Sequence, residues 1–200
     1  MTKLVLLDIG KVLIDFDFQR AVQSLQKAVP VDLVKLAKLF KISSLTEDFD
    51  RGTIAEEPFF QAIQKEMNFP MSLADFTVHW NCIFMENKEM VDLALRLKKN
   101  YMVSILTNTN PWHVAELKKN HPWVFEFQDF IASCEVKLMK PDPEIYRLAL
   151  RRAKVRPEEV FYVDDIAENI VSAEKLGIDV VRFRSYAVLL KEIEKRNLKF

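Results

Sequence analysis

The strongest constraint on the fold is a short unbroken aliphatic run that ends in a carboxylate. Residues 4–7 read Leu-Val-Leu-Leu, and Asp8 follows them directly. A strand that is buried on both faces lacks alternation, so this run predicts a strand in the middle of a parallel sheet. Open α/β sheets bind ligands outside the carboxyl ends of their strands. Asp8 is therefore a candidate site residue, with a simple helix cap as the alternative. Gly10 would let the backbone turn away at once and leave its carbonyl free to point back into the site.

A second run of the same kind lies far along the chain. Residues 160–163 read Val-Phe-Tyr-Val and are followed by Asp164 and Asp165, with Asn169 shortly after them. Adjacent carboxylates at a strand end repel each other unless a cation or hydrogen bonds hold them. Together with Asp8 they would form an oxygen-rich cluster of the kind that binds Mg²⁺. The alternative is structural, with Asp165 capping a helix through Asn169 while Asp164 is solvated.

Two further segments place polar groups near predicted helix starts. Residues 101–106 form a mostly apolar run that ends in Thr-Asn-Thr-Asn at positions 107–110, before Pro111. Proline fits the first turn of a helix, and N–H groups with a hydroxyl at such a start make a phosphate cradle. An ordinary Thr/Asn cap explains the same residues. Further on, Lys140 precedes Pro141 and a predicted helix start, although a lone lysine is usually a solvated charge.

In this order, the four segments resemble the motifs of the haloacid dehalogenase superfamily of phosphotransferases. The resemblance extends from Leu4 to about Phe183. It is closest to a branch of small sugar-phosphate phosphatases, including α-D-glucose-1-phosphate phosphatases, whose first motif reads Asp-x-Gly-x-Val. Residues 8–12 match that motif. Three other stretches also look like this branch, at residues 51–54, 107–110 and 176–178.

The order of helical and extended patterns agrees with the fold that this resemblance implies. From about residue 15 to residue 87 no convincing strand is predicted, and apolar residues recur at helical spacing. After Asn87 helix and strand patterns alternate, as they do in right-handed βαβ units on a parallel sheet. We expect an α/β fold with a doubly wound, Rossmann-like parallel-sheet core of residues 1–15 and 88–200. An inserted α-helical cap of residues 16–87 would follow the first strand.

The resemblance implies an Mg²⁺-dependent phosphatase that acts on a small phosphate monoester, with a sugar phosphate such as glucose 1-phosphate as substrate. Asp8 would attack phosphorus and form an aspartyl-phosphate, releasing the alcohol. Mg²⁺ would neutralise charge between the nucleophile and the phosphate. The implied metal ligands are Asp8, the Gly10 carbonyl and Asp164, with Asp165 acting through water. The other implied roles are phosphoryl binding by Thr107 and the Asn108 N–H, charge compensation by Lys140, and orientation of the Asp164–Asp165 pair by Asn169.

Gly10 departs from most phosphatases of the superfamily, which carry a second aspartate there as general acid and base. Such assistance contributes about 10²–10⁴-fold to rate. The sugar-phosphatase branch has glycine at this position. Dehalogenases also lack the aspartate, but they attack carbon without Mg²⁺, so a 2-haloacid dehalogenase is the enzymatic alternative and the Asp164–Asp165 pair argues against it. The non-enzymatic alternative is a retired fold that serves as a binding protein, which predicts loss of Asp8, Lys140 or Asp164; all three are present.

Substrate choice is expected to depend on the cap. The candidates for contacting a sugar are Asp15, Asp17, Glu47, Asp48 and residues 77–81, which include His79 and Trp80. Four aromatic residues at helical spacing are instead expected to form the core of the cap, namely Phe49, Phe76, Trp80 and Phe84. The three histidines, His79, His113 and His121, lack metal-ligand spacing and are expected at the surface. Lys11 and Lys137 are smaller departures from the family pattern, and each is either a solvated lysine or added positive charge near the phosphate entrance.

Composition agrees with a small-molecule enzyme. The 29 basic and 29 acidic side chains cancel, so charge gives no argument for binding nucleic acid or an anionic membrane. No apolar run approaches the roughly 20 residues that a membrane-spanning helix needs. Cys82 and Cys134 have no informative spacing and are expected to be buried thiols. We therefore expect a cytoplasmic enzyme that takes a small phosphate ester, contacts neither nucleic acid nor membrane, and is a monomer or weak homodimer.

Overall fold

The centre of the protein is a five-stranded parallel sheet. In the computed structural model, which describes residues 1–29, 44–68 and 70–200, the strand order is β5-β4-β1-β6-β7. The strands are β1 (Leu4–Leu7), β4 (Met102–Thr107), β5 (Asp129–Ala132), β6 (Val160–Asp164) and β7 (Asp179–Arg182). Strand β1 lies between β4 and β6 and pairs with both in parallel. The predicted central strand is thus confirmed at the predicted residues.

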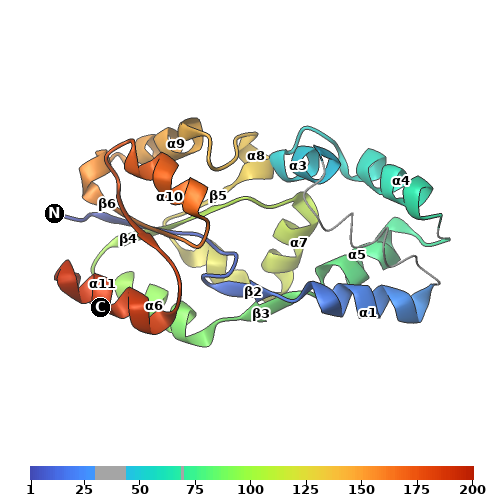
Figure 1. Ribbon diagram of the computed structural model, residues 1–200, viewed down its shortest axis with the longest axis horizontal. Helices are drawn as coiled ribbons and strands as arrows, with labels where there is room; N and C mark the ends of the chain where they lie inside the picture. Colours follow the sequence, from blue (N-terminus) through green and yellow to red (C-terminus); the bar gives the residue numbers. More distant parts are fainter. Residues whose placement is uncertain (30–43, 69) are drawn as a thin grey trace.

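Helices cover both faces of this sheet. Figure 1 shows α9 (Pro143–Ala153) and α10 (Ala167–Glu174) on one side, and α6 (Lys88–Leu97) and α11 (Tyr186–Lys195) on the other. Alternate residues of β1 serve the two layers: Val5 and Leu7 pack with α6 and α11, whereas Leu4 and Leu6 pack with α9 and α10. Burial on both sides explains why β1 has no polar residue, and the doubly wound α/β fold is confirmed. The remaining core helices are α7 (Pro111–Asn120), α8 (Ser133–Val136), η1 (Pro122–Glu126) and η2 (Pro157–Glu159).

A group of helices follows β1 and precedes α6. They are α1 (Phe18–Ala28), α3 (Ser44–Arg51), α4 (Glu56–Met67) and α5 (Leu73–Asn81). These helices share an apolar cluster that includes Phe49, Phe76 and Trp80, three of the four aromatic residues predicted for the cap core. Trp112 of α7 also belongs to this cluster, so α7 joins the inserted helices to the sheet. The proposed domain limits, with a cap of residues 16–87, remain a prediction.

A two-stranded antiparallel ribbon frames the inserted helices. It consists of β2 (Ile14–Phe16) and β3 (Phe84–Glu86), which lie at the two ends of the insertion. The prediction of no strand between residues 15 and 87 is therefore wrong at both limits, because strands of three residues are too short to show a period. Phe84 was expected in the helical core but lies in β3, where its ring packs edge-on against Phe16 at 5.5 Å between centroids.

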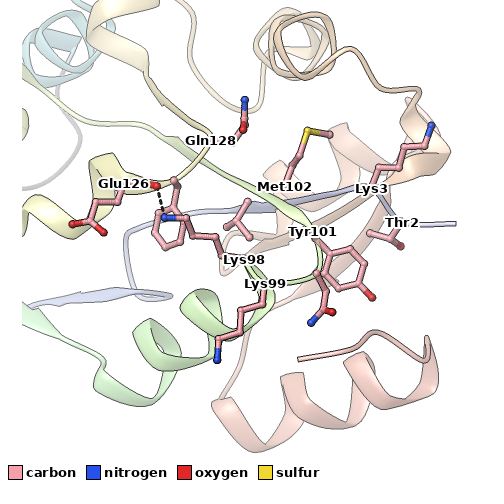
Figure 2. Close-up of a pocket in the computed structure, with 11 residues that line it drawn as sticks. Thr2, Lys3, Lys98, Lys99, Tyr101, Met102, Glu126 and Gln128 are labelled. Atoms are coloured by element: carbon pink, nitrogen blue, oxygen red, sulfur yellow. Dashed lines mark hydrogen bonds between the residues drawn. The ribbon is translucent and has the colours of Figure 1, made fainter.

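The amino and carboxyl ends of the parallel strands carry different groups of residues. A depression of about 720 Å³ lies at the amino ends of β1 and β4. Lys3, Lys98 and Tyr101 are among the residues that line it (Figure 2). Lys3 already pairs with Glu159, and Lys98 donates to the Glu126 carbonyl. The predicted site residues do not line this depression, because they lie at the carboxyl ends of the strands. Within the described ranges, no helix has the length and apolar character needed to cross a membrane.

Two glycines with left-handed backbones offer a matched test of the packing. Gly52 (φ +73°) lies so close to α8 that an added Cβ would be 2.1 Å from the Cys134 carbonyl oxygen, whereas Gly177 (φ +85°) meets nothing nearer than Pro157, at 3.7 Å. We expect Gly177→Ala to lower the free energy of unfolding by about 1–2 kcal/mol, the cost of the left-handed conformation. Gly52→Ala should cost roughly a further 1–3 kcal/mol for the overlap. Urea denaturation measures both, and equal losses would contradict the close contact at Gly52.

Candidate active site

The predicted site residues meet at the carboxyl ends of three neighbouring strands. Asp8 follows β1, Thr107 ends β4 and Asp164 ends β6. One carboxylate oxygen from each of Asp8, Asp164 and Asp165 lies within 4.8 Å of the other two. Every predicted site residue except Asp164 lines a cavity of about 190 Å³, together with Lys11, Phe16 and Ile166. The topology therefore brings together residues that are far apart in sequence.

Lys140 is the buried cation of the site. Its ammonium lies 2.8 Å from Asp8 Oδ1, 2.7 Å from Asp164 Oδ2 and 2.9 Å from the Leu106 carbonyl oxygen. These three acceptors use all three N–H groups of a lysine. Although burial would lower the pKa of Lys140, the two carboxylates raise it above its ordinary value, so the group stays charged. Lys140 thus connects β1, β4 and β6 at their carboxyl ends, and it would reach a substrate only by sharing these donors.

Asp164 is completely buried and surrounded by donors. Its oxygens accept hydrogen bonds from Lys140 Nζ, the Tyr162 hydroxyl, the Ile166 N–H at 2.8 Å and Asn169 Nδ2 at 3.1 Å. Burial would raise its pKa, but Lys140 and the hydrogen bonds lower the pKa of Asp164 below its ordinary value. Asp164 is therefore an ionised group whose oxygens are already occupied. The structural alternative of a solvated Asp164 is wrong.

Asp8 and Asp165 face the cavity instead. Burial raises the pKa of Asp8 to about 7, against the opposing effect of Lys140. Burial and the charge of Asp164 also raise the pKa of Asp165, while Lys140 and Lys11 partly offset that rise. Among the described residues, no side chain donates a hydrogen bond to the Asp165 carboxylate. The raised pKa values mean that the charged forms of Asp8 and Asp165 lack full compensation by positive charge. Because both carboxylates line the cavity, a hard cation such as Mg²⁺ could bind there and supply that charge.

Thr107 and Asn108 also line the cavity, at the end of β4, which lies on the other side of β1 from β6. Asn108 binds the Lys140 backbone reciprocally, donating to its carbonyl at 2.8 Å and accepting from its N–H at 2.9 Å. This pair fixes the loop after β4 against the loop that carries Lys140. The Asn108 side chain is thereby occupied, which leaves its backbone N–H and the Thr107 hydroxyl as the groups that can meet a ligand here. Asn110, in contrast, caps α7 through the His113 N–H, as the simpler interpretation of this segment predicted.

The turn after Asp8 differs from the expected one. The left-handed residue is Lys11 (φ 60°), and Gly10 does not have a positive φ. Glycine is needed at position 10 for space, because an added Cβ would lie 2.8 Å from the ring of Phe16. The Ile9 carbonyl accepts the N–H groups of the following turn, and no backbone N–H in the described chain donates to the Gly10 carbonyl. The prediction that this carbonyl points into the site stays a prediction.

Sequence reasoning missed Tyr162, which donates its hydroxyl to Asp164. Burial and the Asp164 charge raise the pKa of Tyr162 well above its ordinary value, so it remains a neutral donor. Its ring packs edge-on against Tyr146, whose hydroxyl binds the Asn169 carbonyl at 3.0 Å. The available signal was the strand period: residues 162 and 164 point to the same face of β6. Phe16 was missed as well, because β2 was not predicted.

Several of the residues predicted to contact a sugar bind other groups of the protein. None of them lines the described cavity. Asp17 caps α1, Asp48 accepts the Thr53 hydroxyl, and His79 binds Ser24. The prediction that His113 lies at the surface is wrong. Burial lowers the pKa of His113 to about 3. The centroid of its ring lies 6.5 Å from that of Phe16, 5.1 Å from that of Phe84 and 6.4 Å from that of Trp80.

Similar known proteins include both phosphatases and dehalogenases. A model of haloacid dehalogenase-like hydrolases matches residues 2–177. The D-ribitol-5-phosphate phosphatase of Bacteroides thetaiotaomicron is 25% identical over 186 residues, which cover 90% of each chain. A crystal structure of a HAD family enzyme from the same organism, in complex with magnesium and inorganic phosphate, has a TM-score of 0.83 and 26% identity, covering 94% of this chain and 99% of that one. The (S)-2-haloacid dehalogenase 4A of Burkholderia cepacia is 33% identical over 95 residues, or 46% of this chain and 41% of that protein.

Removing the buried cation tests the electrostatics of the site. Lys140→Met leaves Asp8 and Asp164 facing each other, so in chelator we expect the free energy of unfolding to fall by about 3–5 kcal/mol at about pH 8.5. A carboxyl whose folded pKa is raised loses its stabilisation as pH rises, so protonation of Asp8 should make the deficit smaller at about pH 5.5. Adding Asp164→Asn should restore part of the loss. A deficit that is independent of pH and of Asp164, measured by urea denaturation, would contradict this account.

Proposed function

The chain belongs to the haloacid dehalogenase-like hydrolases, and we propose that it hydrolyses a small phosphate monoester through an aspartyl-phosphate on Asp8, with Mg²⁺ as cofactor. The proposed substrate is a sugar phosphate such as glucose 1-phosphate. One observation carries the proposal: Asp8 and Asp165 line a small cavity together with Thr107 and Asn108, whose hydroxyl and backbone N–H are donors suited to phosphoryl oxygens. The volume of about 190 Å³ is below the usual range for drug-sized ligands, which favours a small ester.

Asp8 would be the nucleophile. Lys140 binds its Oδ1 at 2.8 Å and so fixes the orientation of the carboxylate. In the first step an Asp8 oxygen bonds to phosphorus, the bond between phosphorus and the ester oxygen breaks, and the leaving alkoxide takes a proton from water to become the alcohol. Water then attacks phosphorus, the acyl-phosphate bond breaks, and Asp8 and inorganic phosphate are released. Thr107 and the Asn108 N–H would hold non-bridging oxygens during both steps, where fixed donors stabilise developing charge.

The metal ligands fit Mg²⁺ by their chemistry, because they are all oxygens. Asp8, Asp165 and the Gly10 carbonyl would hold the ion, whose charge reduces repulsion between the nucleophile and the phosphate. This assignment revises the expected one, in which Asp164 was the direct ligand and Asp165 acted through water. The oxygens of Asp164 are taken by four donors, so its proposed task is to hold Lys140 in place. Asn169 donates to Asp164 and orients it.

The two alternatives differ in what they need from these residues. A dehalogenase would use Asp8 on carbon and has no use for a metal at Asp165. A binding protein would have no need for a buried Asp8–Lys140–Asp164 arrangement, which is costly to keep desolvated. The dehalogenase keeps some support, because a similar haloacid dehalogenase aligns with almost half of the chain. Halide release is therefore part of the test.

Phosphate release decides among the three functions. We expect turnover of p-nitrophenyl phosphate and of glucose 1-phosphate that requires Mg²⁺ and is abolished by chelator. Asp8→Asn should lower it by roughly 10³-fold or more, as losses of catalytic nucleophiles do. Asp92→Asn is the matched control, because Asp92 is an exposed aspartate of α6 that pairs with Arg96 and does not line the cavity.

Each contrary outcome points to one alternative. Metal-independent halide release from a 2-haloacid, lost in Asp8→Asn, would establish the dehalogenase and refute the phosphatase. An inactive wild-type protein on a panel of phosphosugars and on the haloacid would favour the binding protein. Equal activity of Asp8→Asn and wild type would remove Asp8 from the mechanism altogether.

A further inference from the structure

Lys11 is an exposed residue of the cavity lining with an unusual backbone conformation. Its φ is 60°, and four other residues besides glycine have positive φ among those described, namely Asn68, Lys137, Lys154 and Asn197. All four lie at or just after the C-terminal end of a helix, where such a conformation is common. Lys11 instead follows a strand and a buried nucleophile candidate. A lysine in a conformation that glycine adopts more easily, beside a reaction site, calls for a functional explanation.

Several hydrogen bonds fix the backbone around Lys11, whereas its side chain makes one exposed hydrogen bond. The Lys11 N–H donates to the Ile14 carbonyl at 2.9 Å, and the Ile9 carbonyl accepts from three successive N–H groups of the same turn. The ammonium has a weaker, exposed contact with the Phe16 carbonyl at 3.2 Å. Both Lys11 and Phe16 line the cavity. A small rotation of the side chain can therefore exchange this neutral acceptor for an anionic one, which binds an ammonium more strongly.

The charges of the cavity show what Lys11 adds. Its described lining contains two cations, Lys11 and Lys140, and two carboxylates, Asp8 and Asp165. Lys140 is occupied by Asp8, Asp164 and a carbonyl, so its charge is already balanced. A phosphate monoester carries close to two negative charges at neutral pH. Within the described lining, Lys11 is the cation that forms no salt bridge, although its charge lowers the pKa of Asp165 from a longer distance.

We propose that the Lys11 ammonium binds a non-bridging phosphoryl oxygen of the substrate, as a second cation beside Lys140. This step rests on the proposed phosphatase function, and it assigns Lys11 to binding the phosphate group. The same contact forms with the inorganic phosphate product. Loss of Lys11 therefore weakens phosphate binding and raises KM, with a much smaller effect on kcat, because the contact is present in both the ground state and the transition state.

The test compares four variants of the full chain with Mg²⁺ present. Lys11→Gln removes the charge and keeps the side-chain length, Lys11→Arg keeps the charge, and Lys11→Gly removes the side chain from a backbone that favours glycine. Lys154→Gln is the matched control, because Lys154 is also an exposed, left-handed lysine (φ 55°) but does not line the cavity. The readouts are the Kd of inorganic phosphate by isothermal titration calorimetry, and KM and kcat for p-nitrophenyl phosphate.

We expect Lys11→Gln and Lys11→Gly to raise both the phosphate Kd and KM by roughly tenfold or more, the usual effect of losing a hydrogen bond to a charged group. Lys11→Arg should stay near wild type, and Lys154→Gln should match it. A phosphate Kd within twofold of wild type in Lys11→Gln overturns the proposal, as does an equal loss in Lys154→Gln or no phosphate binding by the wild type. Calorimetry needs no turnover, so it tests Lys11 separately from the proposed function. If the wild type binds phosphate but hydrolyses no ester, and Lys11→Gln binds phosphate more weakly, Lys11 is a phosphate-binding residue and the phosphatase function is refuted.

Discussion

The buried ammonium of Lys140 is the interaction on which the site depends. It binds a carboxylate after β1, a carboxylate at the end of β6 and a carbonyl of β4, and so connects the three central strands at their carboxyl ends. A buried ion pair is stable only when its geometry is good and its remaining polar atoms are satisfied. Tyr162, Asn169 and the Ile166 N–H meet this need at Asp164. Asp164 and Asp165 therefore differ in what they can bind. The Asp164 oxygens already accept hydrogen bonds from four donors, whereas no described side chain donates to the Asp165 carboxylate.

The loop after β1 explains how the protein differs from a phosphatase with a second aspartate. Phe16 packs so closely over Gly10 that no side chain fits at position 10 without moving the ring. Phe16 is held there by β2, which pairs with β3, and by the neighbouring ring of Phe84. The glycine is therefore part of a packed wall, and a proton donor introduced at this position would have to displace the Phe16 ring. The proposed mechanism must release its alcohol without a carboxyl group at position 10.

Sequence alone predicted the strands and their terminal residues but not the partners of each side chain. Unalternated aliphatic runs are strong signals, so β1, β4 and β6 and the residues after them could be located. The different surroundings of Asp164 and Asp165 could not be predicted, since they depend on which of the two carboxylates points toward Lys140. His113 gave no signal either, because its burial comes from Phe16, Phe84 and Trp80, which belong to three separate elements. Strands of three residues, such as β2 and β3, carry too little pattern to be predicted.

The inserted helices are fastened to the same loop that provides the phosphate-facing groups. Asn110, two residues after Asn108, donates to Asp50 of α3 at 3.0 Å, and Ser133 at the start of α8 donates to the Asp50 carbonyl. Burial raises the pKa of Asp50 to about 6, and the hydrogen bond from Asn110 opposes that rise. Gly52 then brings α3 into backbone contact with Cys134. A shift of α3 would therefore be transmitted to the loop of Thr107 and Asn108, so the inserted helices and this part of the cavity lining are structurally coupled.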